Sequence, residues 1–166
     1  MMTSIRPLPG CVRAAIVCTL VAAAAVAQAA EVDASDIQQV RQLFLRQAAA
    51  ETAHDINALD AVIARVPAGQ PDPVSFIARA YQFIGREAVM THFRKTFAGT
   101  WRLDTDEKAI RVIPLGADIV QIYAPTLVTI GAPGQEAKTA PFLINEFAIR
   151  TSAGWRISAI VPVPAQ

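Results

Sequence analysis

The chain has 166 residues, and its 15 Lys and Arg residues against 14 Asp and Glu residues give a formal net charge of +1. The basic residues are interspersed rather than clustered, so no cationic surface for nucleic acid is expected. This length suits one domain with one hydrophobic core.

The N-terminal segment has the features of a secretory signal peptide. Arg6 and Arg13 precede an uncharged Ala- and Val-rich stretch, and Ala27 and Ala29 offer small residues before a cleavage site. We expect residues 1–29 to be removed and the protein to be periplasmic or secreted, without a membrane partner afterwards. A retained anchor is the alternative, although the stretch is short and weakly apolar for a span of about 20 residues.

Cleavage would leave a mature domain of residues 30–166. Loss of Arg6 and Arg13 lowers the 15 basic residues to 13 against 14 acidic ones, a net charge of −1. Cys11 and Cys18 would also be lost, so the mature chain would have no thiol for a disulfide, a metal or a nucleophile.

Three helices are predicted in the first half of the mature chain. Ser35 could cap a helix from Asp36 to about Ala53, whose apolar residues recur every three or four positions: Ile37, Val40, Phe44 and Ala48. Asp55 could cap a shorter second helix that ends before the proline-rich stretch 67–73. Gly85 permits a bend into a third helix, which ends near Gly99 and buries Val89, Met90, Phe93 and Phe97.

The remaining chain is predicted to form strands. Residues 74–84 read as one or two short strands with a turn near Ala80 and Tyr81. Period-two patterns predict four antiparallel strands at 109–115, 119–130, 142–151 and 155–161, joined by hairpin-like turns. Pro125 belongs at a bulge or an edge, because proline cannot donate to the strand ladder.

We therefore predict an α+β fold: a cone-shaped, strongly curved antiparallel sheet whose concave face is covered by three helices from the N-terminal half.

Several short motifs resemble the nuclear-transport-factor-2-like superfamily, and within it the SnoaL-like (SgcJ/EcaC-type) group. They are Ala53-His54-Asp55, Gly85-Arg86-Glu87-Ala88, the turn Leu115-Gly116-Ala117-Asp118-Ile119 and the closing Gly154-Trp155-Arg156-Ile157. The resemblance covers Asp36 to Val161 and implies a cone with a small-molecule pocket and a homodimer formed through the outer face of the sheet. Chemistry in this superfamily varies from none to isomerisation, hydrolysis, dehydration and cyclisation, so the fold alone constrains function poorly.

His54 and Asp55 are candidate catalytic residues, since a histidine beside a carboxylate can act as a general acid or base. Adjacent residues of a helix point in different directions, however, and Asp55 suits the start of the second helix. Helix capping by Asp55 is the favoured interpretation.

Asn145 and Glu146 interrupt an otherwise apolar strand, and strand alternation places them on opposite faces. One of them should therefore enter the interior of the cone, where burial would raise the pKa of a carboxylate. Exposure of Glu146 to solvent or to a dimer partner is slightly favoured.

The candidate ligand-binding residues are Tyr123, Asn145 and Trp101. His92 is expected to be exposed, and Trp155 is expected in the core.

Three functions remain open from the sequence. The first is binding of a small, largely apolar molecule without assured turnover. The second is a cofactor-independent lyase, isomerase or cyclase that uses a pocket carboxylate or histidine, with Asp55, His54 and Glu146 as weak candidates. The third is a dimeric interaction module with a filled cone. No cofactor or metal is expected, because no phosphate loop, nucleophile elbow or metal-ligand spacing is present in the sequence.

Overall fold

A computed structural model describes residues 31–79 and 81–165, so the expected signal peptide lies outside the described residues. Along the chain the elements are α1 (Ala34–Thr52), α2 (Ile56–Val62), β1 (Ser75–Ala78), β2 (Tyr81–Ile84), α3 (Arg86–Thr96), β3 (Thr100–Thr105), a 3₁₀ turn (Glu107–Ala109), β4 (Arg111–Gly116), β5 (Ile119–Gly131), β6 (Lys138–Thr151) and β7 (Gly154–Pro164). Within this part of the chain, no helix is long and apolar enough to cross a membrane.

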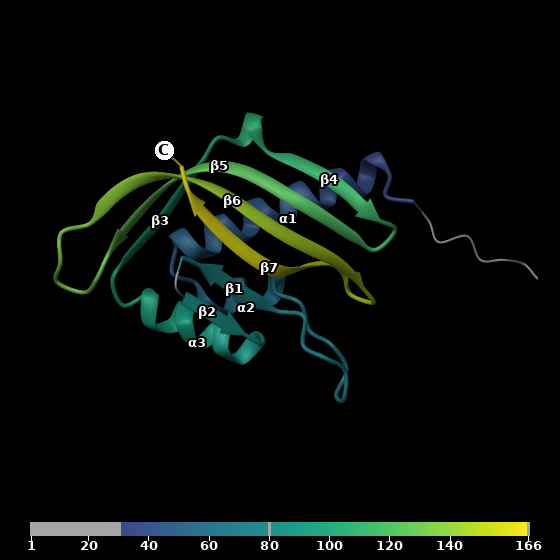
Figure 1. The fold of residues 1–166 in the computed structure, drawn as a ribbon, viewed down its shortest axis with the longest axis horizontal. Helices are drawn as coiled ribbons and strands as arrows, with labels where there is room; N and C mark the ends of the chain where they lie inside the picture. The colour runs from purple at the N-terminus through teal and green to yellow at the C-terminus, as the bar shows by residue number, and fades with distance from the viewer. Residues whose placement is uncertain (1–30, 80, 166) are drawn as a thin grey trace, which may run out of the picture.

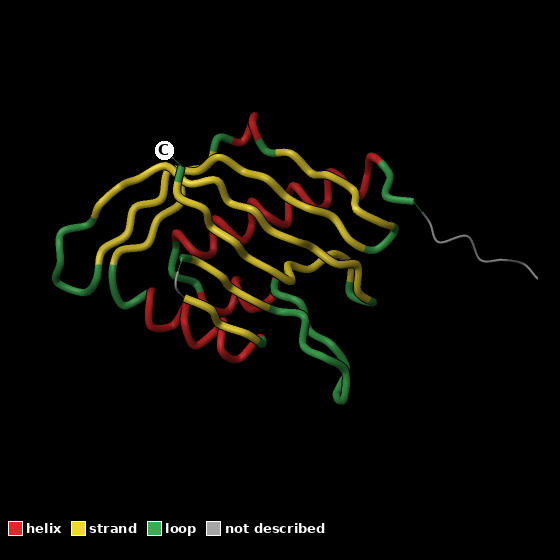
Figure 2. The backbone as a smooth tube through the Cα atoms, in the orientation of Figure 1, coloured by secondary structure: helices red, strands yellow, loops and turns green. Residues whose placement is uncertain are grey.

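The strands form one curved sheet in the order β2-β1-β7-β6-β5-β3, with β4 also paired to β5. Figure 1 shows the long strands β5, β6 and β7 arching over α1, while α2 and α3 lie near β1 and β2. In Figure 2, α2 and α3 lie below the long strands, α1 overlaps these strands in the view, and the 3₁₀ turn lies above them. The predicted α+β fold is confirmed, but the sheet is mixed, because β1 runs parallel to β7.

Two predicted helix starts have different outcomes. Asp55 is the N-cap of α2, and its carboxylate accepts hydrogen bonds from the N–H groups of Asn57 and Ala58. The cap of α1 is Asp33 rather than Ser35: Asp33 accepts from the Asp36 N–H, and the Asp36 carboxylate accepts from the Asp33 N–H. This reciprocal pair begins the helix two residues earlier than predicted.

Asp36 also ties α1 to the sheet. Its carboxylate accepts from the Arg150 guanidinium at 3.0 and 2.8 Å and from the indole N–H of Trp155 at 2.9 Å. These bonds hold the pKa of Asp36 well below its usual range, with the Arg150 hydrogen bond the largest cause. Trp155 is buried in the core as predicted.

Strand β3 was not among the strands predicted from the sequence. Its side chains alternate between half-buried and exposed, because β3 lies at an edge of the sheet beside β5. Pro125 lies where the neighbour of β5 changes from β3 to β4, so its missing N–H interrupts no ladder there. The register shifts of the sheet occur at other positions, between Pro114 and Gly116 of β4 and between Phe147 and Ala148 of β6.

Candidate functional site

A cavity of about 560 Å³ lies between the concave face of the sheet and the helices. Its wall is mostly apolar, and several strands and helices contribute side chains to it. Among the lining residues are Phe76, Trp101, Leu103, Val128, Ile130, Phe142, Ile144, Ile160 and Pro162. A volume of this size suits a small organic molecule.

Two carboxyl groups meet at one part of this wall. Glu51, in the last turn of α1, and Glu146, in the middle of β6, both line the cavity and are almost completely buried. The side-chain amide of Gln47 donates to Glu51 Oε1 at 2.9 Å and to Glu146 Oε1 at 2.6 Å. We call these three residues the Glu51–Gln47–Glu146 cluster.

Burial changes the protonation of this cluster. Desolvation raises the pKa of Glu51 to about 7, although hydrogen bonds from Gln47 and Trp101 oppose the rise. The pKa of Glu146 is raised well above its usual value, mainly by desolvation and to a smaller extent by repulsion from Glu51. Burial therefore favours the protonated form of both carboxyl groups more than it is favoured in an exposed glutamate.

The Trp101 indole N–H fixes the second oxygen of Glu51, Oε2, at 2.9 Å. By contrast, Oε2 of Glu146 is buried and has no hydrogen-bond partner among the described residues. A buried polar atom without a partner costs on the order of 1–3 kcal/mol. This carboxyl oxygen is thus the most evident attachment point for a polar group of a bound molecule.

His92 supplies a second polar group of the wall. It is half-buried, its ring stacks on Phe83 with a centroid separation of 4.2 Å, and its Nε2 also has no partner within residues 31–79 and 81–165. Burial lowers the pKa of His92, so the neutral ring is favoured. The expectation that His92 is exposed was wrong, because β1 and β2 cover the face of α3 that carries it.

The structure separates the predicted ligand-binding residues. Trp101 lines the cavity, whereas Tyr123 and Asn145 do not. They are direct cross-strand neighbours on the opposite face of the sheet, where the Gln121 amide donates to Asn145 Oδ1 at 3.2 Å. Alternation on β6 was predicted correctly, but the polar residue that enters the cone is Glu146, so the favoured exposure of Glu146 was wrong.

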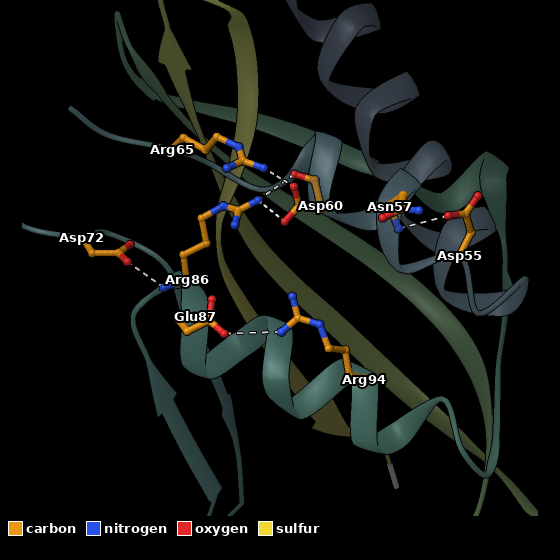
Figure 3. A network of polar contacts seen from close by, with 8 residues as sticks. All are labelled: Asp55, Asn57, Asp60, Arg65, Asp72, Arg86, Glu87 and Arg94. Atoms are coloured by element: carbon orange, nitrogen blue, oxygen red, sulfur yellow. Dashed lines mark hydrogen bonds and ion pairs between the residues drawn. The ribbon is translucent and has the colours of Figure 1, made fainter. Parts of the chain in front are cut away.

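Neither His54 nor Asp55 lines this cavity. Asp55 caps α2, as Figure 3 shows. His54 Nε2 lies 3.1 Å from the Trp101 carbonyl oxygen, and its ring stacks on Phe97. Of the three weak catalytic candidates, the structure places only Glu146 in the cavity.

Sequence reasoning missed Gln47 and Glu51, although a signal was present. With Val40 and Phe44 they continue one stripe of α1 at spacings of four, three and four residues. Two polar residues on the buried stripe of an amphipathic helix indicate an internal polar site. Throughout the described residues, no group of three or more His, Cys, Asp or Glu is arranged to hold a metal ion.

Comparison with known proteins supports the architecture. The profile of the SnoaL-like domain matches residues 40–161. No curated protein matches the chain in sequence.

Solved structures share this fold at low sequence identity. A protein from Streptomyces avermitilis, proposed to be a dehydratase of the NTF2-like family, has a TM-score of 0.67 and 17% identity, and the match covers 79% of this chain and 97% of that one. A ketosteroid isomerase-like protein from Erwinia carotovora atroseptica has a TM-score of 0.67 and 12% identity, with 81% and 99% covered. A proposed calcium/calmodulin-dependent protein kinase type II association domain from Thiobacillus denitrificans has a TM-score of 0.59 and 28% identity, with 75% and 93% covered.

The domain profile spans most of the chain, and the neighbouring structures share its curved sheet and helices. The chain belongs to the SnoaL-like domain family, and it shares its fold with a solved structure described as NTF2-like.

Proposed function

We propose that this protein is an exported domain that binds a small, largely apolar molecule in the cavity between the sheet and the helices. The observation that carries this proposal is the apolar cavity of about 560 Å³, on whose wall a buried carboxyl oxygen has no hydrogen-bond partner from residues 31–79 or 81–165. An apolar pocket with few convergent polar groups is the usual form of a small-molecule site. The same cavity argues against an interaction module with a filled cone.

Filling the cavity should abolish binding of a neutral apolar dye such as Nile red. In Val128→Trp the indole would occupy space beside β5, since Val128 is buried and lines the cavity. We expect saturable, one-to-one dye binding by the wild type and a loss of roughly tenfold or more in affinity in the variant. Fluorescence titration measures both.

The matched control is Leu127→Trp, because Leu127 is the neighbouring residue but is 47% exposed on the other face of the sheet. It should bind the dye as the wild type does. Ile144→Phe, a smaller change in the same wall, tests the proposal again if Val128→Trp fails to fold. Equal dye binding by the two folded tryptophan variants would exclude this cavity as the binding site.

Proton transfer on the bound molecule is a second candidate function, and the Glu51–Gln47–Glu146 cluster favours it. A protonated Glu146 can donate a hydrogen bond to a carbonyl oxygen, while an ionised Glu51 removes a proton from the adjacent carbon. Returning that proton to another carbon would complete an isomerisation without a cofactor.

Hydrogen–deuterium exchange at the carbon next to the carbonyl of a bicyclic ketone, followed by NMR in D₂O, tests this second function. We expect the wild type to accelerate exchange, and Glu51→Gln to remove roughly a hundredfold of that acceleration. Glu87→Gln, which changes an exposed carboxylate of α3 outside the cavity, should leave the rate unchanged. Exchange no faster than in buffer would leave binding without turnover as the function.

Export and self-association complete the proposal. The leader supports export to the periplasm or beyond, and mass spectrometry of the mature protein should find an N-terminus at Ala30. A different mature N-terminus, or an uncleaved chain in the cytoplasm, would contradict it.

We also propose a homodimer formed through the outer face of the sheet. This face exposes Leu127 and Val163, which are 47% and 42% accessible, and exposed apolar surface often marks an interface. Sedimentation velocity should show a dimer for the wild type and a monomer for the double variant Leu127→Asp and Val163→Asp. A monomeric wild type at micromolar concentration would refute this dimer.

A further inference from the structure

The cavity has one closed and one open end, and the strands show its direction. Along β6 the inward side chains change from fully buried Glu146 through buried Ile144 to half-buried Phe142. On β5 exposure rises from 3% at Val128 to 40% at Ile130. All of these residues line the cavity. Glu146 therefore marks the closed end, and Phe142 of β6 and Ile130 of β5 mark the opening.

The open end carries positive charge. Arg79, which follows β1, and Lys95, near the end of α3, are exposed residues of the cavity lining. Neither forms an ion pair with another described residue. Among the described residues of the lining, the only acidic ones are Glu51 and Glu146, in the cluster at the closed end.

Strand register gives the offset of Arg79 from Glu146 along the strand direction. Glu146 pairs with Ile160, and Ile160 pairs with Phe76, so these three residues form one row across the sheet. Arg79 follows Phe76 by three residues, which is roughly 10 Å at the rise of a β-strand. Figure 1 shows that the C-terminal end of α3 and the connection between β5 and β6 lie on this same side of the molecule.

The two ends select different groups of one molecule. At the closed end, Glu146 Oε2 has no partner among the described residues, and in the protonated form that burial favours it can donate to an uncharged acceptor. Negative charge on either carboxyl group of the cluster would repel a carboxylate there. At the open end, Arg79 and Lys95, which pair with no acidic residue in the described part of the chain, attract an anion and disfavour an amine. Apolar and aromatic side chains such as Trp101, Phe142 and Ile144 separate the two ends.

We propose that the ligand is an amphipathic organic acid, bound with its carboxylate at Arg79 and Lys95 and with an uncharged hydrogen-bond acceptor at Glu146. This inference rests on the proposed small-molecule function and adds the class and orientation of the molecule. The apolar body of the ligand occupies the middle of the cavity, beside Trp101 and His92.

Calorimetric titration with three related probes tests this orientation. The first is a naphthalene with an acetyl group at one end of its long axis and a carboxylate at the other. The second is its methyl ester, and the third has an ethyl group in place of the acetyl group. We expect the keto acid to bind roughly fivefold more tightly than the ester, because two exposed ion pairs contribute modestly. The ethyl acid should bind roughly two- to tenfold more weakly than the keto acid.

Variants at the open end of the cavity show which residues cause the preference for the keto acid over its methyl ester. The double variant Arg79→Ala and Lys95→Ala should bind acid and ester equally, and added salt should reduce the preference of the wild type. Arg94→Ala is the matched control for Lys95→Ala, because Arg94 is its neighbour on α3 but pairs with Glu87 outside the cavity (Figure 3). Arg94→Ala should retain the preference for the acid.

The outcomes separate the two proposals. Binding of the ester as tightly as the acid, or an equal effect of Arg94→Ala and Lys95→Ala, would overturn the inferred ligand class and leave the small-molecule pocket standing. Failure of all three probes, together with no binding of the neutral dye by the wild type, would overturn the pocket itself.

Discussion

The free energy of unfolding is expected to fall by about 3 kcal/mol between pH 4.5 and pH 7 because of Glu51 alone. An unfolded glutamate releases its proton near the ordinary pKa of 4.5, whereas folded Glu51 holds its proton until about pH 7. In this range the folded state binds more protons than the unfolded state, so each rise in pH favours unfolding. Above about pH 7 both states are ionised, and the contribution of Glu51 becomes constant.

Other buried groups shape the same pH profile. Glu146 acts in the same direction, because burial and repulsion from Glu51 also raise its pKa. His92 acts in the opposite direction below pH 6.5, because its pKa is lowered and the unfolded chain takes up the proton more readily. Asp36, with a lowered pKa, contributes stability above 3.8 that is lost as the pH falls further. The most stable state is therefore expected in mildly acidic solution.

Urea unfolding at a series of pH values between 4.5 and 8 measures this effect in the wild type, Glu51→Gln and Glu146→Gln. Each substitution should reduce the fall in the free energy of unfolding with rising pH, even where loss of the carboxylate changes the absolute stability. Glu87→Gln is the control, because Glu87 is exposed and its side chain lies outside the cavity. A wild-type stability that is constant or rises over this range, or an undiminished decline in both cluster variants, would contradict the raised pKa values of the cluster.

Local chemistry made several parts of this structure predictable. Asp55 caps α2 because its carboxylate reaches the free N–H groups of the next turn, and that preference depends on few residues. Gly85 has φ of +87°, a backbone conformation that suits glycine, which explains why the bend before α3 was evident. The alternation along β6 likewise follows from strand geometry alone.

Long-range contacts determined what the sequence could not predict. The parallel pairing of β1 with β7 joins Phe76 to Ile160, and nothing local in residues 74–84 specifies that partner. The choice between Asn145 and Glu146 as the inward residue depended on Gln47, which is 99 positions away from Glu146 in the chain. Strand β3 was missed because its outward positions are polar and solvent-exposed, as in a loop.

The polar residues of α1 at the candidate site also show the difference between what local sequence and what long-range contacts determine. Gln47 and Glu51 were visible as polar residues at buried positions of α1, but their meaning required the position of Trp101 and Glu146 on two separate strands. Desolvation of Glu51 arises only when those strands close over the end of α1. A raised pKa is therefore a property of the assembled fold rather than of any motif.

Phe93→Ala is expected to lower the unfolding free energy by about 3–5 kcal/mol, the usual cost of removing a buried phenylalanine ring. Phe93 is completely buried on the inward face of α3. Its ring meets Phe76 of β1 and Trp101 of β3 edge-on, with centroid separations of 5.6 and 6.2 Å. The ring thus fills the space between one helix and two strands that are distant in the chain, and little nearby can move to replace it.

Urea unfolding of Phe93→Ala and Phe97→Ala separates this effect from a general loss of aromatic surface. Phe97 is only half-buried and stacks on His54, so its removal should cost about 1–2 kcal/mol. Equal losses in the two variants would show that the contact of α3 with β1 and β3 is not specifically packed.

Phe93 does not line the cavity, but its two edge-on neighbours, Phe76 and Trp101, do. Folded Phe93→Ala should therefore also bind the neutral dye more weakly than folded Phe97→Ala, because Phe76 and Trp101 lose the support that fixes their position in the cavity wall.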